Sequence, residues 1–95
     1  MKVSREQRAA EIQESIRQIL FRDWDPIGVN HNPKLADEYD GYIGPVYRIL
    51  TGSRAEDDLL GFLYRTEHDQ IGTGCESPEH LRPVARKLLT LNVRL

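Results

Sequence analysis

Apolar residues recur every three or four positions along four stretches of the chain, and turn-forming residues separate the stretches. They span approximately residues 4–22, 35–51, 53–70 and 77–91. A period near 3.6 residues places such side chains along one face of a helix, and no segment shows convincing strand-like alternation. The sequence therefore predicts an all-α fold, a compact bundle of about four short amphipathic helices in a single domain over residues 1–95.

Local signals mark where these helices begin. Ser4 followed by Gln7 forms a capping-box pattern, and Ser53 followed by Glu56 forms a second one after the stop signal of Gly52. The dipeptide Ser77-Pro78 places a cap before proline at the first helical position. We therefore expect the first, third and last helices to begin at these residues.

The second stretch allows two interpretations. Its apolar stripe is long, while Gly41, Gly44 and Pro45 lie on the opposite face. We favour one helix over residues 35–51 that bends at Pro45, because proline removes one backbone hydrogen bond. The alternative is a short turn over residues 35–42 and a new helix from Gly44.

The composition indicates a soluble globular protein. Apolar residues make up 39% and charged residues 29% of the chain, and no apolar run approaches the ~18 residues of a membrane span. The first twenty residues carry charges and no signal-peptide core, so we expect a cytoplasmic protein. The one cysteine, Cys75, excludes an internal disulfide and a multi-cysteine zinc site.

The charge distribution is more informative than the formal net charge of −2. Residues 23–42 contain five acids and a single lysine, together with the only tryptophan. The cations of the last helix follow two acids and are typical of a helix end. We therefore expect neither nucleic acid nor a membrane as a partner.

An imidazole among carboxylates suggests a metal site, with His31, Asp37 and Asp40 as the candidate ligands. Their spacing does not match two facing ligand pairs on helices. We predict no metal and no cofactor, and keep a small metal-dependent enzyme using His31 as the alternative.

Cys75 lies just before a helix start, where a helix dipole lowers a thiol pKa. No nucleophile motif surrounds it, so we predict no catalytic residue and expect that the protein is not an enzyme.

Residues 23–45 combine acids, rings and small residues, which favours a surface for another protein. The type I turn pattern Asp25-Pro26-Ile27-Gly28 lies within this segment. Trp24 also fits a core residue that covers the end of the bundle, and we favour this structural interpretation for it. The partner-binding candidates are Asp23, Trp24, Asp25, Asp37, Asp40, Gly41 and Gly44.

The same segment resembles a group of small bacterial proteins, mostly without assigned function. They carry a Trp-Asp-Pro-Ile-Gly turn, which is residues 24–28 here, and an Asp-Glu-Tyr-Asp-Gly-Tyr helix start, which is residues 37–42 here. The similarity extends from about Ile16 to Leu91, with a weaker match over residues 84–89. The resemblance implies a compact helical domain and a bacterial source, and it implies no activity or catalytic residue.

These observations favour a small protein-binding module that uses residues 23–45. An immunity or antitoxin-like role is one concrete version, in which the acids oppose the basic cleft of a nuclease toxin. Self-association through Val93, Leu95 or the face from Gly41 to Pro45 is a further hypothesis.

Overall fold

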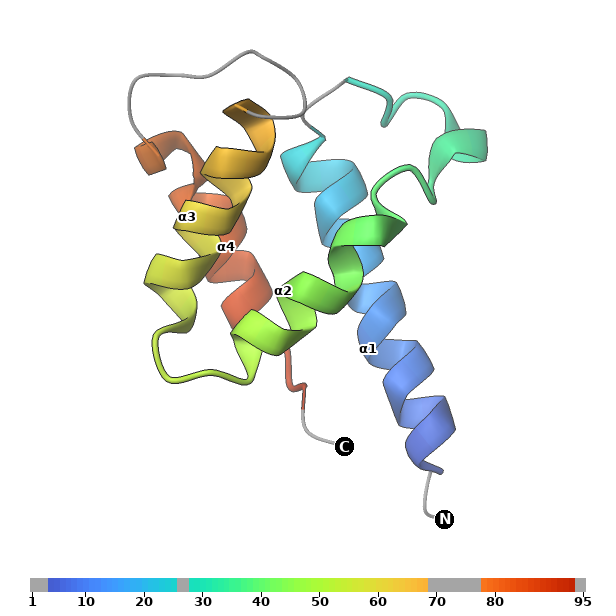
Figure 1. The fold of residues 1–95 in the computed structure, drawn as a ribbon. Helices are drawn as coiled ribbons and strands as arrows, with labels where there is room; N and C mark the ends of the chain where they lie inside the picture. Colours follow the sequence, from blue (N-terminus) through green and yellow to red (C-terminus); the bar gives the residue numbers. More distant parts are fainter. Residues whose placement is uncertain (1–3, 26–27, 69–77, 94–95) are drawn as a thin grey trace.

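The described part of the chain folds as four α-helices joined by shorter helical turns (Figure 1). The computed structural model describes residues 4–25, 28–68 and 78–93. Within these ranges no strand occurs, so the predicted all-α class is confirmed. No helix among them is long and apolar enough to cross a membrane. The elements are α1 (Arg5–Ile19), η1 (Leu20–Trp24), η2 (Pro33–Leu35), η3 (Asp40–Tyr42), α2 (Ile43–Leu50), α3 (Ala55–Thr66), η5 (Pro78–Leu81) and α4 (Arg82–Leu89).

The hydrophobic core lies where α1, α2, α3 and α4 meet. Helix α2 contacts both α1 and α3, while α4 packs against α3 and α1. The predicted stripes of the first and last helices are largely buried. Their most buried members are Ile12, Ile16, Ile19, Leu20, Leu81, Val84, Ala85 and Leu88.

The first helix begins as predicted and ends in a wider turn. The Ser4 side chain accepts a hydrogen bond from Gln7 N, and the Gln7 side chain accepts one from Ser4 N, which completes the capping box. After Ile19 the backbone winds as a π-helix, and Asp25 N donates to Leu20 O over 2.9 Å. This wider winding buries Leu20, Phe21 and Trp24 together.

The prediction of one bent helix over residues 35–51 was wrong. Two separate 3₁₀ turns, η2 and η3, precede α2, which begins only at Ile43. Pro45 therefore lies in the first turn of α2, where its missing N–H has no helical partner to lose. The alternative of a turn region followed by a new helix describes the segment correctly.

The predicted capping box at Ser53 is also wrong. Helix α3 begins at Ala55 with Arg54 as its N-cap residue and no side-chain cap. The Glu56 carboxylate contacts Arg82 at 3.6 Å and Arg86 at 3.3 Å on α4. Glu56 thus links two helices, and a carboxylate engaged with α4 does not complete a box with Ser53.

The last helix opens with the 3₁₀ turn η5 and becomes α-helical at Arg82, with Pro83 in its first turn. Ser77 and Cys75, predicted as a helix cap and a weak thiol candidate, lie outside the described residues.

Candidate functional site

Residues 23–45, here called the acidic–aromatic segment, connect the end of η1 to the start of α2. The described part of the segment contains two 3₁₀ turns and lies against α1 and α3 through named side-chain contacts. Each candidate residue can therefore be assigned to a contact within the fold or to the surface.

Trp24 belongs to the core. Only 7% of the residue is exposed, and its ring packs at 5.5 Å from Tyr39 and 5.6 Å from Tyr42. Its indole Nε1–H donates to Glu67 Oε1 over 3.0 Å. The other oxygen of Glu67 lies 3.0 Å from His80 Nε2. Trp24 thus joins η1 to the ends of α3 and η5. It is a core residue and not a surface residue.

Sequence reasoning missed Glu67, a buried acid at the C-terminal end of α3. Acids are rarely buried without partners, and this one has two. The only available signal was that a buried tryptophan N–H requires an acceptor. Periodicity does not indicate which acceptor lies opposite.

Asp25 organises the turn that follows Trp24. It adopts a left-handed conformation with φ 37°, and Gly28 N donates to its carbonyl over 3.1 Å, which closes a four-residue turn. The type of this turn depends on residues 26 and 27, which lie outside the described residues.

The Asp25 carboxylate accepts three hydrogen bonds. The donors are Val29 N at 2.8 Å, Asn30 N at 3.0 Å and the Tyr39 hydroxyl at 2.7 Å. Partial burial raises the pKa of Asp25, but these donors and the nearby His31 outweigh it and hold the pKa below its ordinary 3.8. Asp25 is therefore a structural acceptor that fixes the loop.

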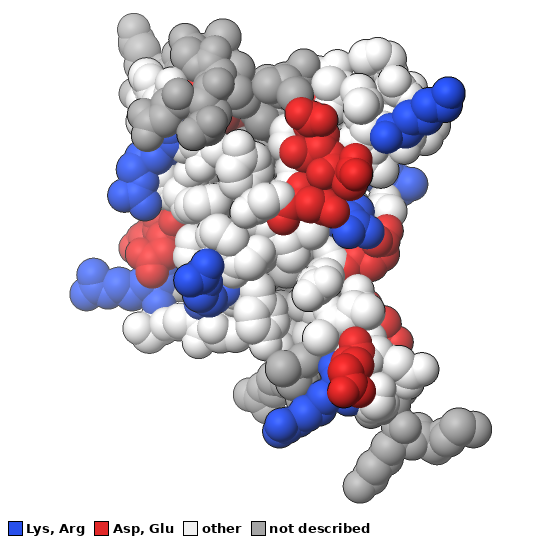
Figure 2. Space-filling model, turned by 45° about the vertical axis from the view of Figure 1, so that its right-hand side comes forward, with Lys and Arg blue, Asp and Glu red and all other residues white. Residues whose placement is uncertain are grey.

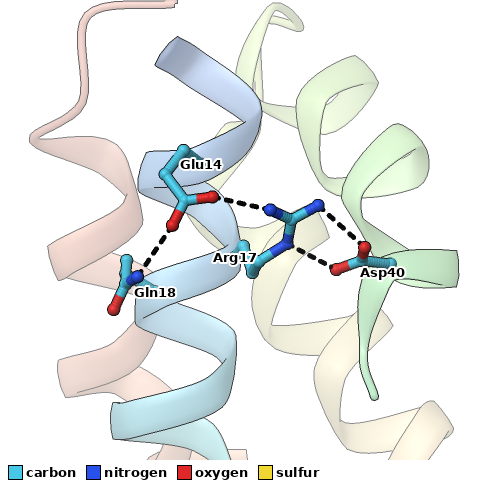
Figure 3. Close-up of polar contacts among 4 residues, drawn as sticks. All are labelled: Glu14, Arg17, Gln18 and Asp40. Atoms are coloured by element: carbon cyan, nitrogen blue, oxygen red, sulfur yellow. Dashed lines mark hydrogen bonds and ion pairs between the residues drawn. The ribbon is translucent and has the colours of Figure 1, made fainter. Parts of the chain in front are cut away.

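Asp40 forms a two-pronged ion pair with Arg17 of α1. The Arg17 Nε and one terminal nitrogen donate to the two Asp40 oxygens, each over 2.8 Å. The second terminal nitrogen of Arg17 contacts Glu14 at 2.6 Å, and Figure 3 shows Arg17 between these two carboxylates. The hydrogen bond from Arg17 to Asp40 raises the pKa of the arginine above its ordinary value. This geometry attaches η3 to α1.

The remaining acids differ in what they contact. Asp23 pairs with Lys87 of α4 at 3.1 Å on the surface. Asp37 and Glu38 are exposed, and the ion pairs among the described residues include neither of them. Figure 2 shows acidic side chains gathered on the face that carries η3. Two of the five acids in the segment therefore remain available for an outside contact.

The small residues of the segment also differ. Gly41 is exposed, and a Cβ built on it would meet nothing within 4 Å. Gly44 lines a shallow hollow of about 170 Å³ between α1 and α2. The other residues around the hollow are Ala9, Gln13, Ile43 and Tyr47.

The candidate metal ligands do not converge. Asp40 binds Arg17, while His31 lies in an exposed turn near Asp25. Within the described ranges no group of three or more His, Cys, Asp or Glu side chains is arranged to hold an ion. The metal-enzyme alternative thus receives no geometric support from these residues.

No family model, curated protein or solved structure matches the chain in the three comparisons. The resemblance to small bacterial proteins stays a prediction, and functional arguments depend on the chain's own surface.

Proposed function

We propose that the protein is a small binding module for another protein, and that Asp37 and Glu38 contact basic side chains of that partner. The observation that supports this proposal is that some acids of the segment form contacts within the fold and others are exposed. The fold uses Asp23, Asp25 and Asp40 in ion pairs or hydrogen bonds, whereas Asp37 and Glu38 are exposed next to them. Trp24 and Asp25 act in the proposal as supports that hold the contact surface in place.

Electrostatics explains why two neighbouring acids suit this role. Exposed charges add modestly to affinity, but they orient an approaching partner and increase the association rate. The turns before Asp37 and the Asp40–Arg17 pair after it hold both ends of this short stretch. A stretch whose backbone is held at both ends loses less backbone freedom on binding than a mobile one.

An immunity or antitoxin-like role is the concrete form of the proposal, because a nuclease toxin presents a basic cleft. In that form Asp37 and Glu38 replace the nucleic acid phosphates as counter-charges. This form of the proposal can be tested by measuring the binding of the chain to a purified nuclease toxin.

Affinity capture from the native cell extract, followed by mass spectrometry, tests the proposal. The baits are the wild-type chain, the Asp37→Asn/Glu38→Gln variant, and the Asp57→Asn/Asp58→Asn variant as a control. Asp57 and Asp58 are also adjacent exposed acids, so each of the two variants removes two negative charges. They lie in the first turn of α3, outside the acidic–aromatic segment. We expect a basic protein to be captured by the wild type and the control but lost with the first variant. Equal capture by all three baits contradicts the proposal.

A further inference from the structure

Residues of both α1 and α2 line the hollow between these helices. Ala9 and Gln13 lie one turn apart on α1, and Ile43, Gly44 and Tyr47 line it from α2. The Tyr47 hydroxyl donates to the carbonyl of Val93 over 3.4 Å, which holds one wall in place. A Cβ built on Gly44 would meet only the tip of Arg48, at 3.9 Å, so there is room for a side chain at this position.

The size of the hollow limits its occupant. Pockets for drug-sized ligands occupy ~300–1,000 Å³, so about 170 Å³ is too small for such a molecule. A cavity of ~150 Å³ accepts a benzene-sized group. The hollow therefore suits one aliphatic side chain that is carried by a larger molecule.

The charges around the hollow indicate what accompanies that side chain. Arg17 lies four residues after Gln13, and Asp40 lies four residues before Gly44. The ion pair between Arg17 and Asp40 is therefore about one helical turn from residues that line the hollow. The charge of Arg17 is already matched by two carboxylates. Asp37 and Glu38 shortly precede Asp40 in the chain and are exposed, and the ion pairs among the described residues include neither, so further negative charge lies along the segment that leads to the hollow.

A cation lies beside Gly44, one of the residues that line the hollow. The Arg48 guanidinium lies close to Gly44, and the ion pairs among the described residues do not include Arg48. A basic group on the occupant is repelled there and attracted toward Asp37 and Glu38. The charge pattern thus orients an occupant as well as attracting it.

We propose that the hollow binds one aliphatic side chain from an amphipathic helix of the partner protein, and that a lysine or arginine one turn away contacts Asp37 and Glu38. This rests on the proposed function and specifies its partner. The aliphatic side chain is the anchor and the cation sets the direction, as in other recognition of a helix by a groove.

The test uses an isotope-labelled full chain and synthetic peptides followed by nuclear magnetic resonance. The first peptide is an alanine- and glutamine-based helix of about 16 residues, long enough for partial helicity, with one leucine and one lysine four residues away. Two matched peptides replace the leucine by alanine or the lysine by glutamate. We expect the first peptide to shift the amide signals of Gln13, Gly44 and Tyr47, and each matched peptide to bind more weakly.

Two variants of the chain complete the design. Gly44→Leu fills the hollow, and Gly61→Leu is the control because a Cβ at Gly61 in α3 meets nothing within 4 Å. Loss of the buried leucine contact should weaken peptide binding by about tenfold or more in Gly44→Leu, with no change in Gly61→Leu. Unchanged circular dichroism of both variants shows that folding is retained.

Any other result of the peptide experiments contradicts a particular part of the proposed interaction. If the alanine peptide binds as well as the leucine peptide, the hollow is not the anchor site, although the proposed function stands. If the glutamate peptide binds equally well, the acidic contact and the proposed function fail together. If the protein alone shows concentration-dependent shifts that Gly44→Leu removes, the occupant is a second copy of the chain. Absence of binding by the first peptide overturns the inference entirely.

Discussion

Replacing Asp25 by asparagine tests whether this acid is a structural acceptor. Asparagine keeps the shape and tolerates the left-handed backbone at φ 37°. One side-chain oxygen can still accept from Val29 N and the Tyr39 hydroxyl, but an NH₂ group then faces Asn30 N, which was a donor at 3.0 Å. The variant therefore loses one acceptor and the negative charge that strengthens the other two bonds.

The expected cost follows from these contacts. A hydrogen bond to a charged group contributes ~1.5–3 kcal/mol, and partial exposure of Asp25 reduces this. We expect the free energy of unfolding near pH 7 to fall by about 1–2 kcal/mol. Urea denaturation followed by the fluorescence of the single tryptophan, Trp24, measures it directly.

The pH dependence provides an independent check. A carboxyl whose folded pKa is lowered contributes stability above its unfolded value, and loses it as pH falls through the folded pKa. The difference between wild type and Asp25→Asn should therefore shrink below about pH 3.8. The control Asp37→Asn should stay within about 0.5 kcal/mol of wild type, because Asp37 is exposed and lacks an ion pair among the described residues. Equal costs for both variants near pH 7, or a cost for Asp25→Asn that persists in acid, would refute the structural role.

Substitutions at Trp24 and at two glycines test further contacts through their effect on stability. Trp24→Phe removes the donor to Glu67 and part of the buried ring, and should lower the free energy of unfolding by roughly 2–4 kcal/mol in urea denaturation; a loss below ~0.5 kcal/mol would show that this bond is unimportant. Gly44→Ala and Gly61→Ala place a methyl group where a Cβ meets little, and each should stabilise by up to about 1 kcal/mol in thermal unfolding. A lower melting temperature for Gly44→Ala alone would mean that the hollow lacks the space described.

Periodic patterns predicted the helices whose apolar stripes are continuous. Helix α4 buries Val84, Ala85 and Leu88 as its spacing indicates, and Ser4 caps α1 because a local hydrogen bond decides that position. In α3 the adjacent residues Leu59 and Leu60 are both buried, so burial there extends beyond a single stripe. Side chains near the edge of a stripe are buried or exposed according to which helices pack beside them.

The boundaries of α2 and the contacts of the acids could not be predicted from the sequence. Pro45 is compatible with a kink and with a first helical turn, and the placement of η3 against Arg17 selects the second. Likewise, Asp40 and Asp37 are the same residue type three positions apart, yet within the described ranges only Asp40 contacts a guanidinium. A contact across 23 residues of sequence makes Asp40 structural, and local spacing contains no record of it, whereas the backbone donors to Asp25 lie only four and five residues away.

The salt dependence of partner affinity shows whether Asp37 and Glu38 serve a partner whereas the other acids of the segment serve the fold. The dissociation constant of the captured protein is measured by calorimetry at about 50 mM and about 200 mM salt, for wild type, Asp37→Asn/Glu38→Gln and Asp57→Asn/Asp58→Asn. We predict that the first variant binds about tenfold more weakly at low salt and loses most of the salt dependence, while the second behaves as wild type. Equal affinities and equal salt dependence for all three proteins would contradict the account.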